Sequence, residues 1–356
     1  MKKLLALALS AALALGALSG CGAKQAEIAL VTDTGSIDDG SFNQGAWEGV
    51  VTYSEEKAIS RQSFQPSEQS TEAYVQSIDR AVERGAKVVV CPGYLFADAV
   101  AQAAQAHTDV AFIAVDCQLP DAAPANAVGL VYAEEQAGFL AGYAAVKEGM
   151  TSLGFLGGEA SASVVRYGYG FVQGAEYAAG QMGLADGAVQ VRYGYTGSFE
   201  ASPEAKDRAA AWYDAGTQVI FACGGAMGES VIEAAEEYGT KVIGVDVDQS
   251  AMSDAVIFSA TKSLSTSVYD MIASFYDETF PGGQNVRMDA SNNGVALTMD
   301  TARLGKLTQK EYDTLYAQLA SNAGDIAANI VATPAEDGSV AASGMQLVKV
   351  IVDETA

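Results

Sequence analysis

The sequence predicts an α/β protein made of two doubly wound halves, each a parallel sheet with helices on both faces. Three observations support this prediction. The chain has 356 residues, about twice the ~150 of a single domain. Short, wholly apolar runs alternate with longer segments of helical spacing, as in sheets that are buried on both faces. This alternation runs once from Glu27 to about Gly129 and again from about Thr151 to Asp248.

The first twenty residues have the features of an export signal. Lys2 and Lys3 precede an apolar stretch, residues 4–18, which is too short to span a bilayer comfortably. The stretch ends in Leu-Ser-Gly followed by Cys21, which resembles a bacterial lipobox. We therefore expect a signal peptide over 1–20, a lipidated Cys21 that begins a tether over 21–26, and a chain anchored on the extracytoplasmic face of the membrane. The alternative is an ordinary signal peptide with a coincidental cysteine. No later run of ~18 apolar residues predicts a membrane span.

The strands and helices of the mature chain follow from hydrophobic spacing. Six apolar runs predict strands: Ile28–Val31, Val88–Cys91, Ala111–Val115, Leu153–Leu156, Val219–Ala222 and Val242–Val245. Apolar positions at helical spacing predict helices through residues 46–51, 74–82, 137–144, 231–235 and 264–275. Ser41 and Gln44 predict a capping box before the first of these helices. Ser202 and Pro203 predict the start of another helix near residue 203.

Composition excludes several classes of function. The 44 acidic and 20 basic residues argue against a nucleic-acid partner, because that affinity depends on Lys and Arg. The single histidine, His107, argues against His-rich metal sites and Ser-His-Asp triads. Cys91, Cys117 and Cys223 lack metal-ligand spacing and are expected to be buried apolar filler. We expect no metal and no cofactor.

Candidate ligand-binding residues lie at the carboxyl ends of predicted strands, where sheets of this type bind ligands. Asp33, Asp116 and Asp246 each follow such a strand. A carboxylate there accepts hydrogen bonds from hydroxyls or base N–H groups, which suits a polar, uncharged ligand such as a sugar or nucleoside. The alternative is that each Asp caps the following helix or turn.

A glycine turn and two aromatic residues add to this picture. Gly224 and Gly225 follow a predicted strand and open a helix, but they match neither a dinucleotide fingerprint nor a phosphate-binding loop. The turn could equally serve only to reverse the chain. Phe42 and Phe199 lie just before predicted helices, one in each half, and could stack on a planar ring from both sides. They could also be simple loop anchors.

Taken together, these segments resemble the basic membrane protein (BMP) family, lipoproteins related to a purine-nucleoside receptor that act as substrate-binding components of ABC importers. The specific segments are Val31–Asp33 with Ile37–Gly49, and the Gly-Val-Asp-x-Asp-Gln stretch within Ile243–Gln249. Supporting segments are Glu135–Gly142, Gly197–Phe199, Val219–Phe221 with Gly224 and Gly225, and Thr261–Lys262. The resemblance extends over nearly all of the mature chain.

The resemblance implies a type I periplasmic-binding-protein fold, with two lobes joined by a three-strand hinge and the ligand between them. By analogy, residues 27–130 plus 260–290 form lobe 1, and residues 131–259 plus 291–356 form lobe 2. The purine would stack between Phe42 and Phe199. Asp246 and Lys262 would hold the ribose, and Asp33, Asn43 and Asp116 would also contact the ligand. Without the resemblance, Lys262 would be taken as a surface ion pair. The implied partners are a nucleoside and the permease and ATPase subunits of an ABC transporter.

Three points remain open from sequence. Ala226 and Met227 depart from the family's Gly-Gly-Thr-Gly turn, which could alter the pocket. A sensing lipoprotein of the same fold, for another ring-bearing metabolite, would carry the same motifs. Asp246 and Asp248 also resemble the D-x-D of metal-dependent phosphatases, although that motif normally opens its domain.

Overall fold

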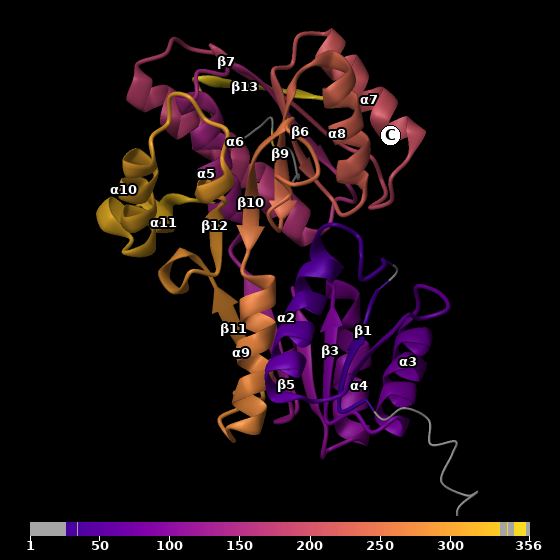
Figure 1. Cartoon of the computed structure of the whole chain (residues 1–356). Coiled ribbons are helices and arrows are strands. Elements are labelled where there is room, and N and C mark those ends of the chain that lie inside the picture. Colours follow the sequence, from indigo (N-terminus) through magenta and orange to yellow (C-terminus); the bar gives the residue numbers. More distant parts are fainter. Residues whose placement is uncertain (1–25, 34, 335–339, 341–344, 354–356) are drawn as a thin grey trace, which may run out of the picture.

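The computed structural model describes residues 26–33, 35–334, 340 and 345–353. The expected signal peptide and Cys21 lie outside these residues. The described chain forms two lobes, each built around one sheet (Figure 1). Within the described part of the chain, no helix is both long and apolar enough to cross a membrane.

The first lobe contains a six-stranded sheet in the order β11-β5-β4-β3-β1-β2, and every neighbouring pair is parallel. Its strands are β1 (Ile28–Val31), β2 (Arg61–Phe64), β3 (Val88–Pro92), β4 (Ala111–Val115), β5 (Ala127–Tyr132) and β11 (Gln284–Met288). Its helices are α2 (Phe42–Lys57), α3 (Thr71–Glu83), α4 (Ala97–Ala106) and α9 (Leu264–Tyr276), and α9 lies beside α2 although about 200 residues separate them (Figure 1). Alternate residues of β1 face opposite sides of the sheet. Ile28 packs in the cluster that includes α2 and α9, and Ala29 in the cluster of α3 and α4. This sheet is therefore buried on both faces.

The second lobe contains a seven-stranded sheet in the order β12-β10-β9-β8-β6-β7-β13, in which only the β10–β12 pair is antiparallel. Its strands are β6 (Ser152–Gly157), β7 (Val189–Tyr195), β8 (Val219–Cys223), β9 (Lys241–Asp246), β10 (Val256–Lys262), β12 (Val295–Leu297) and β13 (Val348–Val352). Its helices are α5 (Glu134–Lys147), α6 (Ala162–Met182), α7 (Pro203–Asp214), α8 (Met227–Tyr238), α10 (Gln309–Ala320) and α11 (Ile326–Asn329).

All six predicted strands are present, and the prediction of an α/β fold with two parallel sheets is confirmed. Several strands were missed because they lie at sheet edges or carry polar residues. The edge strand β2 reads Arg-Gln-Ser-Phe and β11 reads Gln-Asn-Val-Arg-Met, so neither shows an apolar run. The expected lobe boundary at residues 259 and 260 falls inside β10, which stays in the second sheet as far as Lys262.

The chain passes between the lobes three times: from β5 to α5, from β10 to α9, and from β11 to β12. Three consecutive side chains at the start of α5 bind the other two crossings, one after β10 and one after β11. The Glu134 carboxylate lies 3.3 Å from the Lys262 ammonium, and the Glu135 carboxylate accepts a 2.6 Å hydrogen bond from Arg287. The Gln136 side-chain oxygen accepts a 2.9 Å bond from the Ala290 N–H. The hinge is thus held together around the first turn of one helix.

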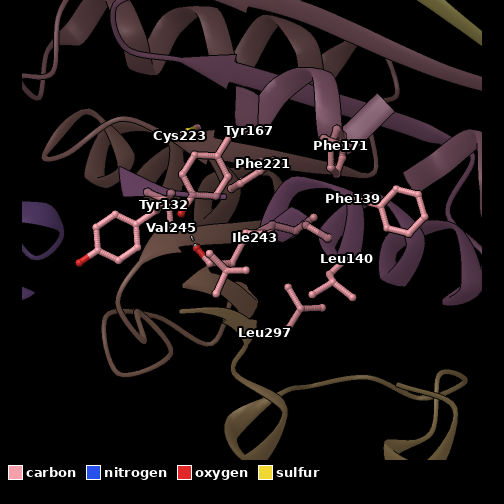
Figure 2. Packing of buried hydrophobic residues seen from close by; sticks show 14 of the residues in the cluster. Tyr132, Phe139, Leu140, Tyr167, Phe171, Phe221, Cys223, Ile243, Val245 and Leu297 are labelled. Atoms are coloured by element: carbon pink, nitrogen blue, oxygen red, sulfur yellow. Dashed lines mark hydrogen bonds between the residues drawn. The ribbon is translucent and has the colours of Figure 1, made fainter. Parts of the chain in front are cut away.

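Helices α5 and α6 pack backbone to backbone through glycines. A Cβ added to Gly138 or Gly142 of α5 would overlap the carbonyl oxygens of Tyr167 and Phe171 on α6. Gly170 and Gly174 of α6 meet the backbone of α5 in the same way. The glycines recur every four residues and so lie on one face of each helix. Figure 2 shows the adjoining core, in which Tyr167, Phe221 and Cys223 gather beside the end of β8.

Candidate functional site

A cavity of about 230 Å³ lies between the lobes at the carboxyl ends of both sheets. This is far more than the ~10–15 Å³ needed by one water. Its lining includes all nine residues predicted to bind a ligand: Asp33, Phe42, Asn43, Asp116, Phe199, Gly224, Gly225, Asp246 and Lys262. The fold therefore brings together side chains from both halves of the sequence.

Asp116 and Asp246 occupy equivalent places in the two lobes. Asp116 follows β4 and Asp246 ends β9, and both have left-handed backbone conformations, with φ of 57° and 66°. Asp and Asn tolerate this region better than other non-glycine residues. The residue type thus satisfies the strand-end turn and also places a carboxylate in the cavity.

Lys262 is buried at the end of β10 among three carboxylates. Its Nζ lies 2.8 Å from Asp116 Oδ2, 3.3 Å from Glu134 Oε1 and 3.8 Å from Asp246 Oδ1. It also lies 5.3 Å from the centroid of the Phe42 ring, within cation–π range. The side chain is only 3% exposed, so the surface ion pair suggested by residue type alone is wrong. Lys262 instead joins a strand end of each lobe to the hinge.

The charges in this cluster set one another's protonation. Burial opposes the charge on Lys262, but the three carboxylates outweigh it and raise the pKa of the lysine. Burial and then the negative charge of Asp116 raise the pKa of Glu134 to about 8. Burial also raises the pKa of Asp246. Burial opposes ionisation of Asp116 too, but Lys262 together with hydrogen bonds from its neighbours lowers the pKa of that carboxyl. The ionised form of Asp116 is therefore favoured beside Lys262, whereas the environment of Glu134 favours its protonated form.

The start of α2 differs from the predicted capping box. The Asp39 carboxylate, and not the Ser41 hydroxyl, accepts hydrogen bonds from the N–H groups of Ser41, Asn43 and Gln44, at 2.9–3.0 Å. The Ser41 hydroxyl donates a 2.7 Å bond to Asp246 in the other lobe. The capping prediction was wrong because an acceptor two residues upstream binds several free N–H groups at once. Because Asp39 accepts these bonds, the Ser41 hydroxyl is available to link the lobes.

Asn43 lines the cavity and keeps one buried acceptor without a partner among the described residues. Its Nδ2 lies 3.2 Å from Asp33 Oδ1 and 3.3 Å from Asp39 Oδ2, and carboxylates only accept, so both bonds require the amide NH₂ at that position. The Asn43 Oδ1 is buried with no hydrogen-bond partner among the described residues. The Asp116 carboxyl, by contrast, shares a side-chain hydrogen bond with Glu134. A buried acceptor without a partner is costly, so a hydrogen-bond donor brought beside Asn43 would be favoured.

The turn after β8 requires glycine because the backbone at Gly158 lies very close to it. Gly225 has φ of +54°, and a Cβ on Gly224 would overlap the backbone N–H of Gly158. Ala226 lines the cavity, whereas Met227 is fully buried in the lobe core. Of the two departures from the family turn, only Ala226 is placed to meet a ligand.

Sequence reasoning missed several residues at the site. Tyr94, Ser163 and Tyr167 line the cavity, and Ser163 donates a 2.8 Å hydrogen bond to Asp116 across the lobes. Tyr167 lies beside the regularly spaced glycines of α6, so its place in the sequence predicts a core residue and not a cavity residue. Glu134 is fully buried and also accepts a 2.6 Å bond from Arg166, but in sequence it is simply one of two adjacent glutamates.

The three cysteines of the described chain are buried, as expected, and no disulfide joins them. Cys223 also lines the cavity. Over the residues that the structure describes, no cluster of His, Cys, Asp and Glu is arranged to hold a metal.

Comparison with known proteins supports the family resemblance. A family model described as "ABC transporter substrate-binding protein PnrA-like" matches residues 26–332. The chain is 30% identical over 333 residues to the "ABC transporter nucleoside-binding protein BmpA" of Lactococcus lactis subsp. cremoris, covering 85% of this chain and 92% of the relative. It is 29% identical to "Basic membrane protein A" of Borreliella burgdorferi, covering 90% and 94%.

Solved structures show the same fold. An ABC transporter solute-binding protein from Aeropyrum pernix K1 superposes with a TM-score of 0.75 at 20% identity, covering 88% of this chain and 95% of that one. A second solute-binding protein, from Conexibacter woesei, gives a TM-score of 0.69 at 23% identity, covering 85% and 97%. The predicted type I periplasmic-binding-protein fold is confirmed by this likeness.

Proposed function

Since the chain belongs to the family of PnrA-like ABC transporter substrate-binding proteins, we propose that it binds a nucleoside between its lobes and delivers it to a membrane permease. Family membership makes it a solute-binding protein and not an enzyme, so the phosphatase alternative is wrong. The family also implies an extracytoplasmic location. Lipidation of Cys21 is part of the proposal and would keep the receptor beside its transporter.

One observation carries the choice of ligand: Phe42 of the first lobe and Phe199 of the second line the same cavity as Asp116, Asp246 and Lys262. Two ring faces suit a planar base, and clustered carboxylates suit the hydroxyls of a sugar. We propose that a purine stacks between the phenylalanines, that Asp246 and Lys262 hold the ribose, and that Asp33, Asn43, Asp116 and the Gly224–Gly225 turn complete the contacts. The name of the Lactococcus relative agrees with a nucleoside.

The proposed cycle needs no bond to be made or broken. An open form captures the ligand, the three crossings bend, and the closed form docks on the permease. The Ser41 to Asp246 and Asp116 to Ser163 bonds both join one lobe to the other, so they form only when the lobes are together. A sensing role in the same family would use the same closure but a different partner.

Thermal-shift screening against nucleosides, free bases, ribose and vitamins, followed by calorimetry, tests the proposal. Ligand binding to the native state raises the melting temperature by mass action. We expect a shift with adenosine, guanosine or inosine and none with ribose or the free bases. A shift only with another ring compound would keep the receptor and discard the nucleoside.

Aromatic variants test the stacking. Phe42→Ala and Phe199→Ala should each weaken nucleoside binding by about 1–3 kcal/mol, roughly 5- to 150-fold in Kd, if base-stacking energies carry over. Phe280→Ala is the matched control, because Phe280 is a half-buried phenylalanine that packs on Phe275 and does not line the cavity. Unchanged affinity in both cavity variants would contradict the ring sandwich.

A further inference from the structure

A buried glutamine outside the cavity joins the two lobes. Gln249 follows β9 in the second lobe, is only 2% exposed, and is not one of the described residues that line the cavity. Its side-chain Nε2 donates a 3.0 Å hydrogen bond to the backbone carbonyl of Gly40, 209 positions away in the first lobe. Gln249 therefore binds the opposite lobe without being placed to touch a ligand.

The other end of the same amide is fixed within the second lobe. Gln249 Oε1 accepts a 3.0 Å bond from the Val245 N–H, and the Gln249 N–H donates a 3.0 Å bond to the Ser259 hydroxyl. A Cβ on Gly244 would come within 2.6 Å of Gln249 Oε1, so the glutamine can fold back over the strand end only because β9 has a glycine there. Val245 directly precedes Asp246, whose left-handed turn places a carboxylate in the cavity. Gln249 therefore supports the strand end that carries a proposed ligand-binding residue.

Gly40 lies in the segment of the first lobe that carries cavity residues of its own. The chain runs from Gly40 through Ser41 into α2, whose first two residues, Phe42 and Asn43, line the cavity. The Gly40 N–H also donates a 3.2 Å bond to Gln44 Oε1, which ties the position of the glycine to the start of the helix. One glutamine amide thus connects, through two backbone groups, the ligand-binding segments of both lobes.

This bond does not compete with a ligand, unlike interlobe bonds made inside the cavity. The Ser163 bond to Asp116, for example, occupies a carboxylate that lines the cavity. Neither Gly40 nor Gln249 is among the described lining residues, so their bond stays available when the cavity is filled. The orientation of the amide is also fixed, because an N–H donor faces its oxygen and a carbonyl, which only accepts, faces its nitrogen. The contact therefore depends on closure alone.

We propose that Gln249 is the latch of the closed receptor, a positioning residue that holds the lobes together by donating to Gly40 and holds the strand end at Asp246 by accepting from Val245. The inference rests on the proposed function and deepens it, because it names a residue that sets affinity without touching the ligand. When a receptor captures its ligand in an open form and then closes, a contact made only on closure raises the closed population and slows release. Loss of the latch should therefore speed dissociation and leave capture unchanged.

Two substitutions separate the halves of the latch. Gln249→Met keeps an unbranched side chain of similar length and removes both the donor and the acceptor. Gln249→Glu keeps an acceptor for the Val245 N–H, but an ionised carboxylate has no proton to donate to Gly40. The matched control is Gln218→Glu, because Gln218 Oε1 also accepts two backbone N–H bonds, at the start of β6, but is exposed and makes these bonds within one lobe.

Binding of adenosine, guanosine and inosine to the purified receptor, measured by calorimetry and surface plasmon resonance, tests the latch. At pH 7.5 we expect both Gln249 variants to bind a nucleoside at least about tenfold more weakly than wild type, because closure leaves the Gly40 carbonyl without its donor. The dissociation rate should account for most of this loss, and the association rate should stay within about threefold of wild type. Gln218→Glu should bind like wild type.

The glutamate variant adds a signature that a merely structural role would not give. When the lobes part, the new side chain faces water and ionises as a solvated carboxyl does, whereas the closed form needs its proton for the bond to Gly40. Closure of this variant therefore takes up a proton. The ratio of its Kd to the wild-type Kd should rise at least about threefold from pH 5 to pH 8.5, and the same ratio for Gln249→Met should stay constant.

The outcomes separate the two proposals. Wild-type affinity in Gln249→Met would overturn the latch and leave nucleoside binding intact, and so would a loss confined to the association rate. A Kd ratio for Gln249→Glu that does not change with pH would also overturn it, and this result decides the matter if the methionine variant fails to fold. Absence of binding of all three nucleosides by the wild-type receptor would overturn the proposed function and the latch with it.

Discussion

Replacing Lys262 by methionine is the sharpest test of the buried charge cluster. The substitution keeps an unbranched side chain of similar length and removes the ammonium that lies 2.8 Å from Asp116, 3.3 Å from Glu134 and 3.8 Å from Asp246. Removing one partner of a buried ion pair costs about 3–5 kcal/mol, because the remaining charge stays buried without compensation. At about 2–4 °C per kcal/mol, the melting temperature should fall by at least about 6 °C at pH 7.5.

The matched control is Lys206→Met. Lys206 also pairs with two carboxylates, Glu233 at 3.3 Å and Glu237 at 2.6 Å, but at the surface, where such pairs contribute little. Differential scanning calorimetry of both variants at pH 5 and pH 7.5 is the assay. The fall in melting temperature caused by Lys262→Met should be smaller at pH 5, because the carboxylates that lose their lysine partner can take protons there. If Lys262→Met and Lys206→Met had the same melting temperature at pH 7.5, the cluster's role in stability would be refuted.

Two further variants probe the same region. Asp39→Ala removes the acceptor for three N–H groups at the start of α2 and should lower the free energy of unfolding, measured by urea denaturation, by about 1–2 kcal/mol. The neighbouring Asp38→Ala is the control and should not lower it. Equal stability of the two variants would show that Asp39 does not cap the helix. Glu134→Gln should flatten the pH dependence of stability. The raised pKa of about 8 means that the folded protein keeps a proton that the unfolded chain loses from about pH 4.5, so stability from this group falls as pH rises from 4.5 to 8. Melting curves from pH 5 to 8.5 with the same slope in wild type and variant would contradict this.

The sequence was sufficient for the architecture because each half alternates buried strands with amphipathic helices. It was also sufficient to name cavity residues at strand ends, since topology brings the carboxyl ends of parallel strands to one edge. It failed where a role depends on a partner far along the chain. Nothing local distinguishes Glu134, which is buried against Lys262, from Glu135, which binds the half-exposed Arg287. Likewise, Ser41 reads as a cap, and its bond to Asp246 spans 205 positions.

The left-handed backbone at Asp116 and Asp246 limits how this receptor could diverge. Most side chains would be strained at those φ values, so substitution there is confined in practice to asparagine or glycine. A single nucleotide change converts an aspartate codon to either one. These two positions can therefore lose their charge in one step without loss of the turn, but they cannot readily gain a bulky or basic side chain. New ligand preferences in paralogues should arise instead at Phe42, Phe199 and Ala226, where the cavity wall changes without a change in backbone.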